Sequence, residues 1–306
     1  MIRDINKYIF ILALLLAMTI LSGCVSHNES PFATPSGAPA AAPSGNVSGN
    51  ASGMIKVATT IAPLGDFVKA VGGEKVEVTV VVPPGAEPHT FEPTPSLMMD
   101  VAKADLYVMN GAGLEFWIYK LLEANKGMVV VDSSQGVALL QERKGEIDPH
   151  VWISLRNAAV QVNNICFGLI ALDPANKDYY IKNRDDYLEK LKAMDVELNR
   201  TFAGKKNKIF IVHHPAWTYF ARDYDLSQVP LMENEKEPGP KYLGEVIKLA
   251  RKNNITTIFV EPEYNPKVAE VIGREMNAGI VTLDPLAKNY LENMAYAGKE
   301  IAKSLA

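Results

Sequence analysis

Cysteine is almost absent from this chain of 306 residues, which contains only Cys24 and Cys166. The first lies in a leader-like N-terminal segment and the second in an apolar helical pattern. The mature chain therefore has no pair that could form an intrachain disulfide. Disulfide-stapled folds are excluded, and stability must come from apolar packing. About 250 residues with abundant Val, Ile, Leu and Ala can supply one or two hydrophobic cores.

The chain also lacks a strong excess of charge. Lys and Arg together number 31 and Asp and Glu 35, which gives a formal net charge of −4 at pH 7. The basic residues are dispersed, so the sequence gives no sign of a nucleic-acid partner. Histidine is scarce as well, and its five positions can be considered one by one: His27, His89, His150, His213 and His214.

The first 53 residues have the composition of a secretory leader followed by a tether. An apolar run at 9–21 follows basic residues and is too short for a comfortable membrane span. The sequence Leu-Ser-Gly-Cys that ends at Cys24 resembles a lipoprotein cleavage box, although an uncleaved N-terminal anchor is the alternative. We predict a signal peptide over 1–23, then a lipidated Cys24 and a flexible tether over 24–53, which is rich in Pro, Ala, Ser and Gly. His27 falls in this tether.

From Met54 onward, short apolar strands alternate with single helices, a pattern typical of mostly parallel sheets covered on both faces. The same alternation returns after residue 204, so we predict two α/β lobes. In the first lobe the expected strands are 55–59, 76–82, 106–110 and 128–131, with helices at 64–71, 96–104 and 116–125. In the second lobe they are 209–212, 229–232, 257–260 and 280–283, with helices at 217–224, 242–253, 266–277 and from about 289.

A long helix is predicted between the lobes. Asp173 has the character of an N-cap and Pro174 suits a first helical turn. Apolar residues then recur at helical spacing to about Phe202. About 28 residues give a length of roughly 40 Å, enough to span both lobes, although a surface helix of a single domain is the alternative. We predict an N-terminal lobe at 54–172, a connecting helix at 173–203 and a C-terminal lobe at 204–306.

Two histidines lie in proline-stiffened loops of the first lobe. His89 lies in the proline-rich stretch 83–93, directly after the strand 76–82, at the end where ligands bind in α/β sheets. His150 lies in the sequence Asp-Pro-His-Val-Trp, just before a helix. A single histidine in such a loop is more often an ordinary surface residue. A metal site is therefore indicated only if the second lobe has matching residues.

The second lobe offers matching residues at strand ends. His213 and His214 follow the strand 209–212, and Asp284 follows the strand 280–283. Side chains alternate along a strand, so we expect only one of the two adjacent histidines to reach a shared site. Three imidazoles and one carboxylate that converge from loop ends suit tetrahedral Zn²⁺. On residue types alone, a chance distribution of histidines remains the alternative.

Four motifs, in order, resemble those of the metal-binding receptors of ABC importers for zinc and manganese, the ZnuA/TroA-like group. They are Pro-His-Thr-Phe-Glu-Pro at 88–93, Asp-Pro-His-Val-Trp at 148–152, His-Pro-Ala-Trp-Thr-Tyr-Phe-Ala at 214–221 and Leu-Asp-Pro-Leu at 283–286. The resemblance implies that His89, His150, His214 and Asp284 are the metal ligands. It also implies an extracytoplasmic, lipid-anchored receptor that delivers Zn²⁺ to an ABC permease, and we expect a monomer.

The sequence departs from the family pattern at two places. The loop at 139–147 is short, and it lacks the histidines that many zinc-binding members of the family carry in a long loop at this place. Pro215 stands where Asp usually follows the third ligand, and His213 precedes it, so the ligand of this pair is left open.

Zinc is favoured because His214 stands where manganese receptors of the family commonly have Glu, and manganese is the alternative cargo. Three acidic residues and the other histidine of the pair are candidates for contacts behind the ligands: Glu87, Glu261, Glu263 and His213. For the three acids, a solvated loop position is the simpler interpretation.

A zinc hydrolase is the alternative function. Such an enzyme needs an open coordination position and a general base, whereas four protein ligands would leave no position for water, and the sequence His-Glu-X-X-His is absent. We therefore expect no enzymatic activity. An adhesin, a further alternative, would not by itself require the metal-binding residues. Trp152 and Trp217 are expected to pack around the site.

Overall fold

The computed structural model describes residues 53–141, 145–232 and 238–305. The predicted signal peptide, the lipidation site at Cys24 and nearly all of the tether lie outside these residues. Within the described ranges, no helix is both long and apolar enough to cross a membrane.

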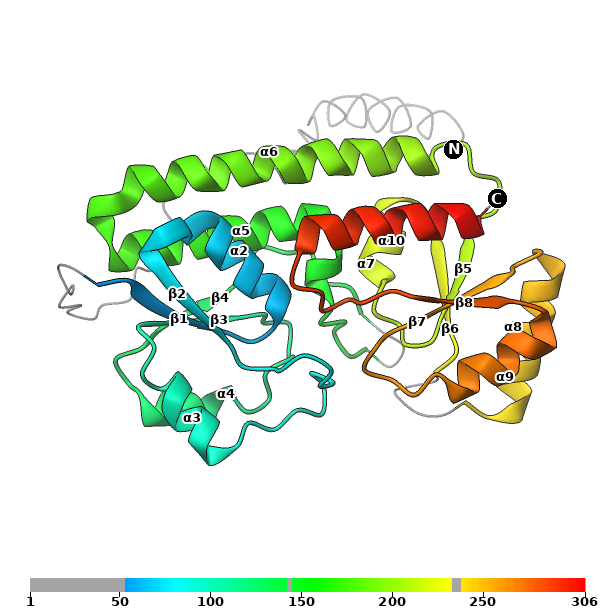
Figure 1. Ribbon diagram of the computed structural model, residues 1–306, viewed down its shortest axis with the longest axis horizontal. Helices are drawn as coiled ribbons and strands as arrows, with labels where there is room; N and C mark the ends of the chain where they lie inside the picture. The colour runs from blue at the N-terminus through cyan, green and yellow to red at the C-terminus, as the bar shows by residue number, and fades with distance from the viewer. Residues whose placement is uncertain (1–52, 142–144, 233–237, 306) are drawn as a thin grey trace, which may run out of the picture.

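The N-terminal lobe is a four-stranded parallel sheet of order β2-β1-β3-β4. Its strands are β1 (Ile55–Thr59), β2 (Val76–Val80), β3 (Leu106–Met109) and β4 (Val129–Asp132). Helices α2 (Ala62–Gly72) and α5 (Leu155–Leu172) cover one face, and α3 (Pro95–Val101) and α4 (Ile118–Ala124) cover the other (Figure 1). Alternation along β3 explains the two layers, because Leu106 and Val108 face α2 and α5 while Tyr107 packs with α3 and α4.

The C-terminal lobe repeats this plan with a parallel sheet of order β6-β5-β7-β8. Its strands are β5 (Ile209–Val212), β6 (Ser227–Pro230), β7 (Thr257–Val260) and β8 (Gly279–Thr282). Its helices are α7 (Thr218–Asp223), α8 (Pro240–Lys252), α9 (Lys267–Met276) and α10 (Tyr290–Ser304). Ile211 packs with α8 and α9, while Phe210 and Val212 face α7 and α10. The predicted fold class, two parallel-sheet lobes and a long helix, is confirmed.

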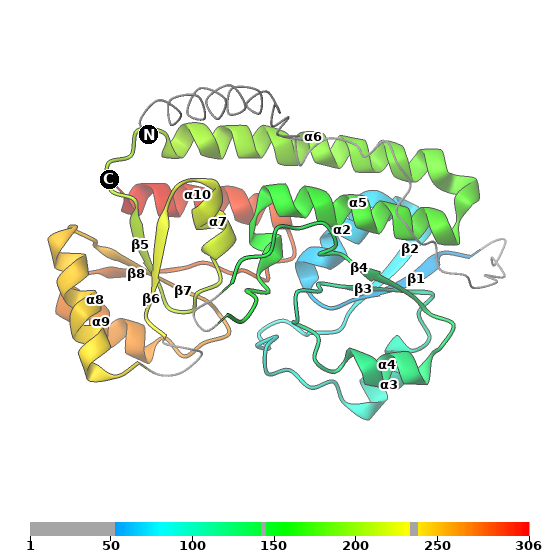
Figure 2. The same cartoon turned by 180° about the vertical axis from the view of Figure 1, so that it is seen from behind.

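Helix α6 (Lys177–Phe202) runs along both lobes, as both views show (Figures 1 and 2). It packs against α2 and α5 of the N-terminal lobe and against α10 of the C-terminal lobe. The contact with α10 is close because Gly298 has no side chain to hold it away from Leu198. The helix begins later than predicted, since Pro174–Asn176 form a 3-10 turn. Asp173 makes no capping hydrogen bond to the backbone there, and its carboxylate accepts from Tyr180 Oη at 2.8 Å instead.

Candidate metal centre

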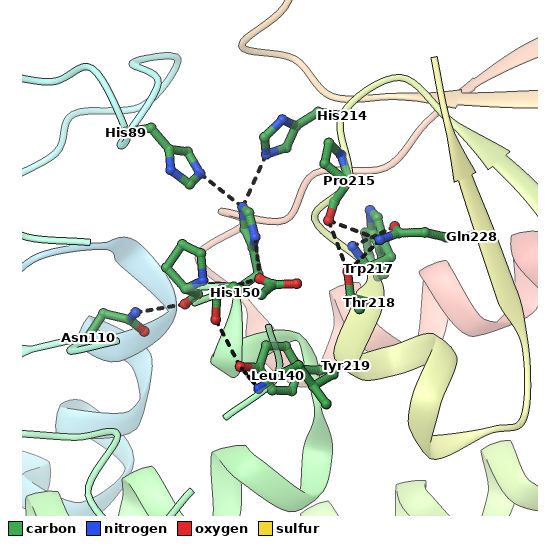
Figure 3. A network of polar contacts seen from close by, with 12 residues as sticks. His89, Asn110, Leu140, His150, His214, Pro215, Trp217, Thr218, Tyr219 and Gln228 are labelled. Atoms are coloured by element: carbon green, nitrogen blue, oxygen red, sulfur yellow. Dashed lines mark hydrogen bonds and ion pairs between the residues drawn. The ribbon is translucent and has the colours of Figure 1, made fainter. Parts of the chain in front are cut away.

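Three histidines meet between the lobes. His89 lies on the loop after β2, His150 directly before the 3-10 turn that leads into α5, and His214 just after β5. Figure 3 shows the rings of His89 and His214 pointing toward His150 from two sides. The Nε2 atom of His150 lies 3.0 Å from Nε2 of His89 and 3.1 Å from Nε2 of His214. Sequence analysis predicted each of these residues for the site, and the structure brings them together.

The spacing of these nitrogens suits a small cation. A tetrahedral zinc ion with Zn–N bonds of about 2.0–2.1 Å holds its nitrogens roughly 3.3 Å apart. One ligand atom from each of the three histidines lies within 4.8 Å of the others. Small shifts of the rings would therefore place all three Nε2 atoms around one ion.

His89 is held by its own loop. The carboxylate of Glu87 accepts hydrogen bonds from the backbone N–H groups of His89 and Thr90, both at 3.0 Å, and from Thr90 Oγ1 at 3.1 Å. The Glu87 side chain is only 18 % exposed, and its Oε1 lies 3.9 Å from His89 Nε2. Glu87 therefore fixes the turn that carries His89, and the interpretation of Glu87 as a solvated loop acid is wrong.

His150 is held by Asp148, two residues earlier. Oδ1 of Asp148 accepts from His150 Nδ1 at 2.8 Å and from the His150 backbone N–H at 2.9 Å. Both residues are buried, and Asn110 and Tyr219 donate to the backbone carbonyls of Pro149 and Asp148, each at 2.8 Å. A carboxylate on Nδ1 directs the Nε2 lone pair toward the site. Sequence analysis named Asp148 only as part of a motif, although the spacing Asp-Pro-His was the available signal.

His214 is held by residues that are distant in sequence. Oε2 of Glu261 accepts from the His214 backbone N–H at 3.3 Å. The ring of Tyr264 stacks on the His214 ring at 5.0 Å, and its hydroxyl lies 3.2 Å from His214 Nδ1. Sequence analysis did not identify Tyr264. His213 is not part of the three-histidine group, and its ring contacts Tyr264 at 5.3 Å. The structure therefore brings His214 to the site.

Glu261 is 2 % exposed, so its interpretation as a solvated loop acid is wrong. The loop after β7 folds back under the end of β5, where a buried carboxylate can accept from the backbone. Glu263 is half-buried, and burial together with the negative charges of Asp284 and Glu87 raises its pKa. Glu263 therefore lies close enough to Asp284 and to Glu87 to be affected by the charge of each.

Asp284 lies outside the three-histidine group. Its Oδ1 accepts from the backbone N–H of Leu286 at 2.7 Å, and burial raises its pKa. The predicted four-residue set thus appears here as three converging imidazoles and a carboxylate held at a greater distance.

Two of the three imidazoles, those of His89 and His214, have lowered pKa values, which favours the neutral form that binds metal. Burial, followed by the proximity of His150, lowers the pKa of His89 to about 3. Burial and the neighbouring histidines also lower the pKa of His214. Burial alone would raise the pKa of Asp148, but the charge and hydrogen bonds of His150 outweigh it, so the pKa is lowered and the carboxylate is ionised.

Trp152 and Trp217 are both buried, as expected of packing residues. Trp152 also ties the lobes together beside the site. Its Nε1 donates to the carbonyl of Pro285 at 2.8 Å, and its own carbonyl accepts from Tyr290 Oη at 2.7 Å.

Comparison with known proteins gives consistent matches. Residues 57–304 match the family model described as zinc-uptake complex component A, periplasmic. The high-affinity zinc uptake system protein ZnuA of Bacillus subtilis is 34 % identical over 254 residues, covering 76 % of this chain and 78 % of that protein. The manganese ABC transporter substrate-binding lipoprotein PsaA of Streptococcus anginosus is 30 % identical over 261 residues, covering 80 % and 83 %. A crystal structure of ZnuA has a TM-score of 0.81 at 36 % identity and covers 83 % of this chain and all of that one.

Proposed function

We propose that Zn²⁺ is the cargo of this chain, which belongs to the zinc-uptake complex component A family and is the metal-binding receptor of an ABC importer. The observation that carries the proposal is the convergence of three imidazoles through their Nε2 atoms. Nitrogen ligands favour zinc over manganese, because affinity for such sites rises from Mn²⁺ to Zn²⁺.

Asp284 is the proposed fourth ligand. Its second carboxylate oxygen would complete the tetrahedron after a shift of the loop that follows β8. Burial raises the pKa of Asp284, so a nearby cation would stabilise its ionised form. Three neutral imidazoles and one carboxylate around Zn²⁺ leave a single positive charge. The carboxylates of Glu87, Glu261 and Glu263, which contact or surround the ligands, offset this charge.

The anchoring of the receptor belongs to the same proposal. Lipidation at Cys24 and the tether over 24–53 would hold the folded lobes at the outer face of the cytoplasmic membrane, beside the permease. The name of the related PsaA describes that protein as a lipoprotein, which supports this placement. Replacing Cys24 with Ala should release the protein or leave it unprocessed. Unchanged processing and membrane association would contradict the anchor.

Competition calorimetry with Zn²⁺ and Mn²⁺ tests the cargo. We expect one Zn²⁺ per chain and much weaker Mn²⁺ binding, with His214→Glu moving the preference toward Mn²⁺. If the wild-type protein binds Mn²⁺ as tightly as Zn²⁺, manganese takes the place of zinc. A bound ion without an exchangeable water ligand would distinguish the receptor from a zinc hydrolase, which requires an open position.

A further inference from the structure

Leu140 and Asp148 form the base of a short antiparallel pairing in the N-terminal lobe. They lie next to the bridge between Gln141 and Ile147. The backbone N–H of Asp148 donates to the carbonyl of Leu140 at 2.9 Å. His150 follows two residues after Asp148, so the position of this base determines where the chain toward His150 starts.

The hydroxyl of Tyr219 bonds to both sides of this base. Tyr219 lies on α7 of the C-terminal lobe and is fully buried. Its Oη accepts from the backbone N–H of Leu140 at 3.0 Å and donates to the carbonyl of Asp148 at 2.8 Å (Figure 3). Both partners are backbone groups, so the direction of each hydrogen bond is fixed, because an N–H only donates and a carbonyl only accepts. A side chain of the C-terminal lobe thus holds together two backbone segments of the N-terminal lobe.

Arg222, one turn later on α7, restrains the ring of Tyr219. Its guanidinium lies over that ring at 5.1 Å from the centroid, a cation–π contact. The same guanidinium donates to Asp223 Oδ1 at 2.7 Å and to the carbonyl of Ala138 at 3.5 Å. Because the ring is buried and lies against a guanidinium that is itself held, the hydroxyl of Tyr219 has little freedom to leave its two partners.

The carboxylate of Asp148 passes this restraint on to His150. Its Oδ1 lies 2.8 Å from His150 Nδ1 and 2.9 Å from the backbone nitrogen of His150. The side chain of Asp148 is only 1 % exposed, so close packing leaves it little room to compensate for a shift of its own backbone. A displacement of the Asp148 backbone would therefore displace the ring of His150.

We propose that Tyr219 is a positioning residue of the metal centre, whose hydroxyl fixes the backbone of Asp148 and thereby the direction in which His150 presents Nε2. Tyr219 and His214 belong to one segment, 214–219, which thus supplies a ligand from the C-terminal lobe and supports a ligand of the N-terminal lobe. The inference rests on the proposed function for the identity of the ion, whereas the contact between Tyr219 and Asp148 does not depend on it.

Tyr219→Phe is the direct test, because it removes the hydroxyl and keeps the buried ring. We expect zinc affinity, measured by chelator competition, to fall about tenfold, the lower end of the range for residues that orient a ligand. Tyr224→Phe is the matched control. Tyr224 directly follows α7, is also buried, and donates its hydroxyl to Asp195 Oδ1 of α6 at 3.0 Å. The control should bind zinc as the wild type does, and unchanged zinc affinity in Tyr219→Phe would overturn the inference.

A double-mutant cycle separates positioning through Asp148 from a general loss of stability. If Tyr219 acts through Asp148, zinc affinity in Tyr219→Phe combined with Asp148→Asn should fall by less than the product of the two single losses. Tyr219→Phe combined with Glu87→Ala should give the product, since Glu87 holds His89 from a different loop. A full product in the pair with Asp148→Asn would contradict the inference.

Amide hydrogen exchange of the metal-free protein gives a measurement that does not depend on metal binding. In Tyr219→Phe the amide of Leu140 loses its acceptor and should exchange roughly twofold to tenfold faster, as expected for one hydrogen bond. The amide of His150, which donates to Asp148 Oδ1, should also exchange faster, and Tyr224→Phe should leave both amides unchanged. Failure of the wild type to bind zinc would refute the proposed function. The amide of His150 would then decide the inference alone, and unchanged exchange in Tyr219→Phe would overturn it.

Discussion

The two lobes share one strand order, yet they hold their histidines in different ways. In the N-terminal lobe, Glu87 holds His89 and Asp148 holds His150, in each case from two residues earlier in the chain. In the C-terminal lobe, His214 depends on Glu261 and Tyr264, which lie 47 and 50 residues later. His89 and His150 are thus held by local turns, whereas the contacts of His214 require β5 and β7 to be paired. We therefore expect His89 and His150 to keep their positions better than His214 when a substitution elsewhere disturbs the sheet of their lobe.

The two lobes also share a buried glutamate at an equivalent place. Each has a buried glutamate in the loop after its third strand, Glu115 after β3 and Glu261 after β7. Each accepts a hydrogen bond from the segment that follows the first strand of its sheet. For Glu115 the donor is Thr60 Oγ1 at 2.6 Å, and for Glu261 it is the backbone N–H of His214. In the C-terminal lobe this buried glutamate therefore supports a proposed metal ligand, His214, whereas in the N-terminal lobe it contacts Thr60, which is not a ligand.

The largest expected effect is that of removing His150, whose Nε2 contacts both other histidines. His150→Ala should weaken zinc binding by more than about a hundredfold, beyond the range for residues that only orient ligands. Calorimetric titration measures this, with Glu87→Ala as the milder comparison. If His213→Ala were damaging and His214→Ala silent, the register at the end of β5 would be wrong.

Substitution of residues that contact the ligands should lower zinc affinity less than loss of a ligand. The size of the decrease should differ between the two lobes. Asp148→Asn removes the charged acceptor of His150 Nδ1 and should lower zinc affinity by about tenfold to hundredfold. Glu261→Gln alters a contact to the backbone of His214 and should cost less. Chelator competition on both variants checks the order. Equal losses would show that the two lobes hold their ligands equally firmly.

The buried Glu115 of the N-terminal lobe should make the free energy of unfolding depend on pH. Burial raises the pKa of Glu115 to about 7, even though Thr60, Asn110 and Gly111 donate to its carboxylate. The folded protein therefore binds more protons than the unfolded chain between about pH 4.5 and 7. This contribution to stability is fully present below that window and is lost as pH rises through it.

Denaturant unfolding of the metal-free protein at pH 5 and pH 7 measures this loss. Relative to Glu115→Gln, the wild type should lose roughly 2 kcal/mol of unfolding free energy over this interval. The variant provides its own control because it lacks the titrating carboxyl group. Identical pH slopes for the two proteins would contradict the raised pKa. His89, whose pKa is lowered, gives the opposite sign, since its contribution is lost as pH falls from about 6.5 toward 3.

The smallest expected change is in overall shape. Helix α6 is continuous over 26 residues and contains neither proline nor glycine, so it resists bending. Metal should order the loops around the histidines and draw Asp284 inward, with little closure of the lobes. Small-angle scattering of metal-free and metal-loaded protein should give nearly equal radii of gyration. A large decrease on adding zinc would show that the lobes move as hinged bodies.

Much of this architecture could be predicted from sequence because its signals are local. Strands β1, β5 and β7 have the bounds predicted for them, and His89, His150 and His214 lie in the predicted loops. The contacts of Glu261 and Tyr264 could not be predicted, since they depend on how β5 pairs with β7. The position of Asp284 outside the three-histidine group could not be predicted either, because it depends on the path of the loop after β8.

The final helix α10 has a consequence for how the receptor folds. Tyr290 and Met294 from this helix share one hydrophobic core with Phe67 and Val68 of the N-terminal lobe, and Phe202 of α6 belongs to the same core. Tyr290 also anchors the start of α10 by donating to the carbonyl of Trp152. The lobes are therefore parts of a single cooperative unit, and neither half should be stable when expressed alone. An ion bound between them would stabilise the whole chain against unfolding, so the loaded receptor should be the form that better resists proteolysis.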